Sequence, residues 1–153
     1  MDSLEQIKNK LGGKILKAEV KNPKRIYIDI GKQDITEAAA FLYRDLDFRY
    51  MVVTGIDRRD GIELLYHFAE DSEGKVYSLR VLLSDKNAPS IESLVPVIKG
   101  ISWIEREIHE LLGVDFAGHP NLKHLLLSDD WPEGKYPLRQ DQNRDQIKDY
   151  EKK

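Results

Sequence analysis

The 153-residue sequence contains no cysteine. This absence excludes disulfides, thiolate zinc sites, iron–sulfur clusters held by this chain, and cysteine nucleophiles. It also fits a reducing compartment, where proteins rarely depend on disulfides. Phosphate-binding glycine loops and the nucleophile elbow of hydrolases are missing as well, so the common signatures of an enzyme active site are not found.

Long apolar runs are also absent. No uninterrupted apolar segment approaches the roughly 20 residues of a membrane-spanning helix. We therefore expect any membrane association to be made through partner proteins. The 27 acidic and 24 basic residues are scattered along the chain rather than gathered into blocks. This distribution gives no sign of a nucleic-acid-binding surface.

The apolar residues, 41% of the total, suffice for one globular domain with a single core. Their periodicity predicts, in chain order, a helix over 4–11, strands over 14–20 and 25–30, a helix over 34–45, strands over 48–54, 62–69 and 76–83, and helices over 91–99 and 103–112. These elements predict an α+β fold: a mixed, mainly antiparallel sheet of about five strands with helices packed on one face.

The helix predicted over 34–45 begins with Asp34 and Glu37 as a capping box. The last predicted helix begins with Ser102 and Glu105 as a second capping box and ends at Gly113. Its apolar stripe is expected to include Trp103 as a core residue, with the charged residues pointing elsewhere. Beyond Gly113 there is little periodicity, and a structureless tail of about 40 residues is too long for an ordinary loop. We divide the chain into an α+β core domain (1–113) and an extended C-terminal arm (114–153) that wraps a partner subunit or is partly disordered.

The last helix also carries Glu105, Arg106, Glu107 and Glu110 within six positions. Glu107 and Glu110 lie on one face at i,i+3 spacing, where like charges repel. Such a face is most stable when a cationic partner surface neutralises it. The alternative is a helix face that is simply solvated.

A longer pattern includes this helix. The chain reads Glu-Arg-Glu-Ile-His-Glu-Leu-Leu-Gly over 105–113, then has Phe116, Gly-His-Pro-Asn-Leu-Lys over 118–123, and Pro-Leu-Arg over 137–139 with Asp141. This pattern resembles the 30 kDa-type subunit of respiratory complex I, including its homologues in energy-converting nickel–iron hydrogenases and related archaeal complexes. In that family an E-R-E-x-x-D/E helix ends at glycine, and an F-x-G-H-P-x-L turn and P-L-R-x-D follow.

The resemblance extends upstream and covers about residues 51–141. The segments 54–57, 66–68 and 78–81 resemble the family's strand, turn and strand. Two pairs, His109–Glu110 and Lys135–Tyr136, differ from many complex I members and are closer to archaeal or hydrogenase-type relatives.

By this resemblance the chain is a non-catalytic scaffold subunit of the peripheral arm of a membrane-bound electron-transfer complex, on the cytoplasmic side of the cell membrane. The implied partners are the large catalytic subunit, of the 49 kDa or hydrogenase-large type, and the iron–sulfur subunits. No cofactor is implied in this chain; iron–sulfur clusters, and a nickel–iron or quinone site, belong to the partners. The residues expected to bind a partner are Glu105, Arg106, Glu107, Glu110, His119, Pro120, Lys123, Trp131, Tyr136, Pro137, Leu138 and Arg139.

Two other functions stay open. Glu105, Glu107 and His119 could be the acid and base groups of a free-standing enzyme, or the chain could be a protein-binding module unrelated to electron transfer. His119 with Asp115 and His124 offers metal-ligand side chains, but their spacing is not that of a metal site. We expect His119 to lock its turn or to hydrogen-bond a partner.

Overall fold

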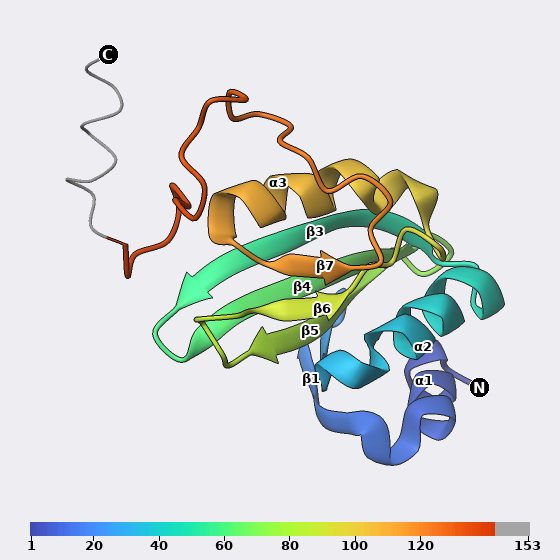
Figure 1. Ribbon diagram of the computed structural model, residues 1–153. Helices are drawn as coiled ribbons and strands as arrows, with labels where there is room; N and C mark the ends of the chain where they lie inside the picture. The colour runs from blue at the N-terminus through green and yellow to red at the C-terminus, as the bar shows by residue number, and fades with distance from the viewer. Residues whose placement is uncertain (143–153) are drawn as a thin grey trace.

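The computed structural model describes residues 1–142 (Figure 1). Its main sheet has five strands in the order β1-β2-β5-β4-β3. Neighbouring strands are antiparallel except β2 and β5, which run parallel. The prediction of a mixed, mainly antiparallel five-stranded sheet is therefore confirmed. The strands are β1 (Ile15–Asn22), β2 (Arg25–Ile30), β3 (Arg49–Arg58), β4 (Gly61–Glu70) and β5 (Lys75–Leu83).

The helices pack on one face of this sheet. Ile28, Leu79 and Tyr66 lie side by side on neighbouring strands, are fully buried, and share one core with Ile7 and Ile108 from the helices. The helical segments are α1 (Ser3–Leu11), η1 (Gly12–Lys14), η2 (Lys32–Asp34), α2 (Ile35–Ala40), η3 (Phe41–Asp45), η4 (Lys99–Ile101) and α3 (Ser102–Leu112). The helix predicted over 34–45 is thus present as α2 and the π-helical turn η3.

The opposite face of the sheet carries polar side chains that pair with one another. Arg80 on β5 binds Asp29 on β2 through two hydrogen bonds. His67 lies between the hydroxyl groups of Thr54 and Ser78, at 3.0 and 2.7 Å. Burial lowers the pKa of His67, which favours the neutral ring in this network.

The helix predicted over 91–99 is wrong. A short strand β6 (Ser90–Glu92) pairs there in parallel with β7 (Asp115–Ala117). The apolar residues Ile91, Leu94 and Ile98 are buried at a spacing that imitates a helix. Pro96 disfavours helical backbone at the residue before it and lacks an N–H group. β7, which is distant in sequence, supplies hydrogen-bond partners for an extended backbone instead.

The predicted caps also differ from those observed. Asp34 makes no side-chain hydrogen bond to the start of α2, and Glu37 forms an ion pair with Lys14. Ser102 is the first residue of α3 rather than its cap, and its hydroxyl lies 3.3 Å from Nε2 of His119. Both helices begin without a side-chain cap because short 3-10 turns lead directly into them.

Candidate functional site: a strap held on α3

The segment after β7, residues 118–142, has no regular secondary structure; we call it the strap. It runs along α3 and then past the C-terminal end of that helix (Figure 1). Val114 and Phe116, which precede it, are buried in the core. Of the arm predicted over 114–153, the first residues therefore pack as part of the core, and 143–153 lie outside the described residues.

Glu110 is the central contact between α3 and the strap. Its side chain is buried, and its carboxylate accepts the backbone N–H groups of Leu125, Leu126 and Leu127 at 2.9, 2.7 and 3.3 Å. Hydrogen bonds from backbone N–H groups to a carboxylate are stronger than those between neutral groups. The sequence predicted that a cationic partner surface would neutralise this carboxylate. In the structure, backbone N–H groups of the chain itself bind it.

Arg106 holds the strap one turn earlier. Its guanidinium donates to the backbone oxygens of Lys123 and His124 at 3.0 and 2.6 Å. Arg106 thus donates hydrogen bonds to backbone oxygens of the strap, while Glu110 accepts hydrogen bonds from the backbone N–H groups that follow them. This complementary pair fixes both the position and the direction of residues 123–127.

Glu105 faces the opposite way and enters the core. It is fully buried and accepts hydrogen bonds from the Ser93 hydroxyl at 2.6 Å and the Leu94 N–H at 2.8 Å. Burial raises the pKa of this carboxyl, and the two hydrogen bonds partly offset the effect. Trp103, predicted in the core, is 70% exposed. The prediction for Trp103 is therefore wrong: Glu105, Ile108 and Leu112 form the buried stripe of α3, and Trp103 lies outside it.

His119 locks the turn that starts the strap. Its Nδ1 accepts the Asn121 N–H at 2.9 Å, and its Nε2 lies 3.0 Å from the Ser102 oxygen. This pair requires a neutral ring with its proton on Nε2, because Nδ1 is an acceptor. Of the two roles expected for His119, the structure provides the turn lock.

Arg139 attaches the far end of the strap. It is 7% exposed and donates to the backbone oxygens of Leu112 and Lys86 at 3.2 and 2.8 Å. It also forms a two-pronged ion pair with Asp141, which lowers the pKa of that carboxyl. The Gln140 N–H donates to Asp57 at the end of β3, at 2.6 Å. These contacts join the strap to the sheet.

Several anchor residues were not singled out by the sequence pattern. Lys86 and Asp57 are far from the strap in sequence. Lys86 carries no motif, and Asp57, although part of the family-like segment 54–57, gave no sign of a contact with the strap. Gly55 had a readable signal, because a glycine inside a strand often marks close backbone approach. A side chain at Gly55 would place its Cβ 2.8 Å from Cδ1 of Leu112, so α3 needs glycine there.

The strap and α3 also present apolar side chains to the surface. Leu126 and Leu138 are 65% and 57% exposed, compared with 70% for Trp103 on α3. A cavity of about 230 Å³ lies between β3 and α3 and is lined by Ile104, Glu107 and Leu138 among others. Pro120 and Lys123 are exposed, and Glu107, Trp131, Tyr136 and Pro137 are half-buried.

The geometry does not assemble the metal ligands that the residue types suggested. Among residues 1–142, no three His, Cys, Asp or Glu side chains are grouped so that they could hold a metal ion. His124 is directed to the Ser128 backbone oxygen instead. Within the same residues, no helix is long and apolar enough to cross a membrane.

Comparisons with known proteins agree on one family. Residues 28–148 match the family described as respiratory-chain NADH dehydrogenase, 30 Kd subunit. The chain is 36% identical over 141 residues to a subunit of the F(420)H(2) dehydrogenase of Methanosarcina mazei, covering 90% of this chain and 88% of the relative. It is 30% identical over 142 residues to hydrogenase-4 component G of Escherichia coli, covering 90% of this chain and 25% of the relative.

A solved structure has the same fold. A chain in the membrane-bound sulfane sulfur reductase, an archaeal respiratory membrane complex, matches with a TM-score of 0.84 at 21% identity. The match covers 98% of this chain and 89% of that one. The family match and the relatives identify the chain as a subunit of a complex I-like or related respiratory membrane complex. The chain belongs to the 30 kDa subunit family of respiratory-chain NADH dehydrogenase, as its sequence pattern predicted.

Proposed function

We propose that this chain is a scaffold subunit that docks on the large catalytic subunit of its complex and holds it beside the iron–sulfur subunits. The strap carries this proposal. Its backbone is fixed from within by Arg106, Glu110 and Arg139. Its side chains Leu126 and Leu138 nevertheless point outward. An ordered segment with exposed apolar side chains is typical of a surface that another protein covers.

The predicted partner-binding residues take two roles in this proposal. Arg106, Glu110, His119 and Arg139 position the strap, because their polar groups hold it to the rest of the chain. Glu105 instead binds Ser93 and Leu94 in the core and contacts no partner in this proposal. Direct contacts with the neighbouring subunit are made by the residues that remain accessible, which are Glu107, Pro120, Lys123, Trp131, Tyr136, Pro137 and Leu138. A strap that is already ordered loses less entropy when it binds.

The proposal places the redox centres in partner subunits and the complex on the cytoplasmic side of the cell membrane. The chain has no cysteine to hold an iron–sulfur cluster. The rival function as an acid and base enzyme is disfavoured, because Glu105 is fully buried and cannot contact a substrate in this conformation. The complex would hold this subunit at the membrane through its membrane-embedded partners.

Co-purification from native membranes tests the proposal. A tagged wild-type chain should bring down the large subunit, identified by mass spectrometry. Leu126→Asp and Leu138→Asp should each reduce its recovery about tenfold or more, because burying one leucine contributes about 1.5–3 kcal/mol. Leu16→Asp is the matched control, since Leu16 on β1 is 73% exposed and distant from the strap in the fold.

Two results would contradict the proposal. One is a wild-type chain that recovers no large subunit. The other is full recovery with both strap variants, provided that circular dichroism shows all proteins folded.

A further inference from the structure

The main sheet has two edge strands, β1 and β3, and only one of them is protected against pairing with a further strand. β1 carries Lys17 and Lys21 and has a register shift near each end. Lysines and bulges are features by which native edge strands avoid an added strand. β3 has neither lysine nor proline along its ten residues, and its one register shift lies near its start. The edge formed by β3 is therefore open.

The backbone along this open edge lacks partners. Alternate residues of an edge strand direct their N–H and C=O groups away from the neighbouring strand. Among residues 1–142, β4 is the only strand that pairs with β3. The Arg58 oxygen, at the end of β3, accepts a hydrogen bond from Lys86. The middle of the strand is accessible, because Val52, Thr54 and Ile56 are all exposed.

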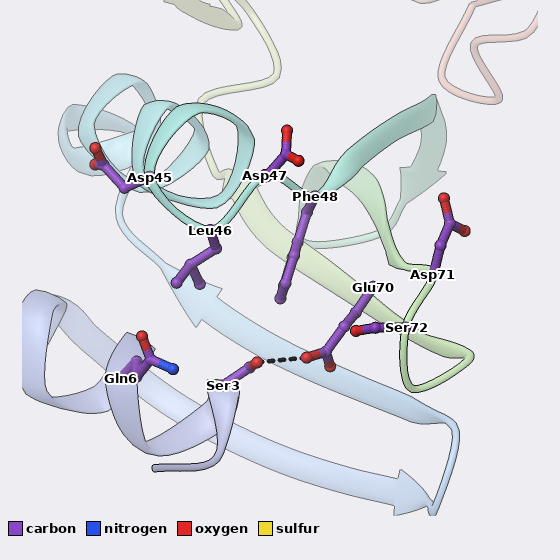
Figure 2. Close-up of a pocket in the computed structure, with 9 residues that line it drawn as sticks. All are labelled: Ser3, Gln6, Asp45, Leu46, Asp47, Phe48, Glu70, Asp71 and Ser72. Atoms are coloured by element: carbon purple, nitrogen blue, oxygen red, sulfur yellow. Dashed lines mark hydrogen bonds between the residues drawn. The ribbon is translucent and has the colours of Figure 1, made fainter.

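β3 is fixed at both ends, so its open edge is already formed in the free chain. Phe48, the residue before β3, is buried, and its ring centroid lies 5.0 Å from that of Tyr77. Figure 2 shows the Phe48 ring and the Asp47 carboxylate pointing in opposite directions. At the other end, Asp57 accepts the Gln140 N–H at 2.6 Å. A strand that is ordered before binding loses less entropy when a partner pairs with it.

The cavity between β3 and α3 lies beside this edge. Gly55 contributes no side chain to it, and its apolar walls include Ile104, Leu111 and Leu138. Glu107 is the only charged residue among the described residues that line it. Its side chain is half-buried and has no hydrogen-bond or ion-pair partner within residues 1–142. A partly desolvated carboxylate in an apolar cavity favours a cationic partner.

We propose that an extended segment of the large catalytic subunit pairs with β3 as a sixth strand and directs a lysine or arginine side chain into the cavity, toward Glu107. This inference rests on the proposed scaffold function and specifies how the subunit docks. Strand addition draws affinity from main-chain hydrogen bonds and specificity from pockets for alternate side chains. The apolar walls suit the methylene stem of a basic side chain, and Glu107 suits its charged end. Leu138 belongs to the strap, so the two docking surfaces are continuous.

A second copy of this chain fits the edge less well. The two arginines of β3, Arg49 and Arg58, lie at its ends and are paired with Asp71 and Glu63. A contact between two β3 strands would therefore bring no free cation to Glu107. The charge of the cavity favours a different polypeptide.

Hydrogen exchange measured by mass spectrometry tests the added strand directly. Residues 49–58 are compared in the isolated chain and in the native membrane complex. Their outward amides should exchange quickly in the chain alone and about tenfold or more slowly in the complex, because pairing supplies their acceptors. Residues 15–22 of β1 are the reference edge and should exchange equally in both. Equal exchange of β3 in the two samples, or equal slowing of β1, would overturn the inference.

Ile56→Lys and Leu82→Lys form a matched pair of variants. Both residues flank Glu63 in register, and they are 42% and 41% exposed. Only Ile56 lies on the open edge, where lysine opposes an added strand. Ile56→Lys should lower recovery of the large subunit, whereas Leu82→Lys should leave it unchanged. Equal recovery with both variants would contradict strand addition.

Glu107→Gln tests the basic side chain. It should lower recovery of the large subunit about tenfold, because a hydrogen bond to a charged group is lost. Asp115→Asn, at an exposed position on β7, makes the same change of charge and is the control. Normal recovery with Glu107→Gln would overturn the assignment of a cationic occupant.

The other outcomes are distinguishable. Light scattering should show the isolated chain as a monomer; a dimer with slowly exchanging β3 amides would make a second copy the occupant and overturn the inference. If wild-type chain recovers no large subunit, the scaffold function is wrong. If recovery is normal and exchange of β3 is the same in the chain and the complex, only the strand inference is wrong.

Discussion

The aromatic ring of Tyr136 lies against Gly113, the residue that ends α3. A Cβ atom added at Gly113 would be 2.5 Å from Cε2 of that ring. The backbone at Gly113 is left-handed, with φ of 77°, a conformation that other residues adopt at a cost. The same glycine therefore ends the helix and leaves the space into which Tyr136 of the strap packs.

Gly113→Ala should destabilise the chain by more than the backbone effect alone. The left-handed conformation costs about 1–2 kcal/mol for a residue with a Cβ, and displacement of Tyr136 adds to it. Chemical unfolding of Gly113→Ala, Tyr136→Ala and the double variant measures both parts. We expect the double variant to be less destabilised than the sum of the single variants. Strict additivity would show that the ring contact is energetically unimportant.

Glu110→Gln should loosen the strap without unfolding the core. The amide replaces one acceptor oxygen by a donor, so at least one N–H of residues 125–127 loses its partner. We expect a loss of about 1–3 kcal/mol and faster hydrogen exchange confined to the strap. Glu107→Gln, on the same helix, is the control because Glu107 is only half-buried. Equal exchange in both variants would rule out the carboxylate as the anchor.

The stability of the chain should carry a pH-dependent contribution from Glu105. Burial raises the folded-state pKa of this carboxyl above its ordinary value of 4.5. The folded state then binds the proton more tightly, so this contribution is fully present below the ordinary pKa and is lost as pH rises through the raised pKa. Tyr50, which Glu105 approaches, stays neutral because burial raises its pKa to about 12.

Glu105→Gln tests this directly, because the amide resembles the protonated acid and does not titrate. Urea unfolding of both proteins across acidic to neutral pH gives the comparison. The variant should gain stability relative to wild type as pH rises. Parallel pH profiles would mean that Glu105 keeps an ordinary pKa in the folded chain.

Arg139→Lys should release the far end of the strap. Lysine keeps the charge but lacks the planar fork that reaches Asp141 and the Leu112 and Lys86 oxygens together. We expect the free energy of unfolding to fall by about 1–3 kcal/mol. The part of the strap that follows residue 127 should also be cleaved faster by proteases. Lys123→Arg, an exposed position on the same strap, is the control. Unchanged proteolysis with Arg139→Lys would show that other contacts suffice to hold the strap.

Much of the fold could be predicted from local sequence. The hairpins, the first two helices and the glycine that ends α3 follow from periodicity and turn residues, which act over a few positions. The helix predicted over 91–99 failed because its alternative partner, β7, lies more than twenty positions away. Glu105 and Glu110 were recognised as unusual but not as buried. The identity of a charged residue does not show which backbone N–H groups will hydrogen-bond to it in the folded chain.

The sequence by itself determined the family, the absence of thiol chemistry and the positions of most elements, because these depend on residue identity and short-range spacing. The tertiary structure alone decided which carboxylates are buried and where the strap lies. These features arise from contacts between segments that are distant in sequence, and the geometry of such contacts is set only when the chain folds.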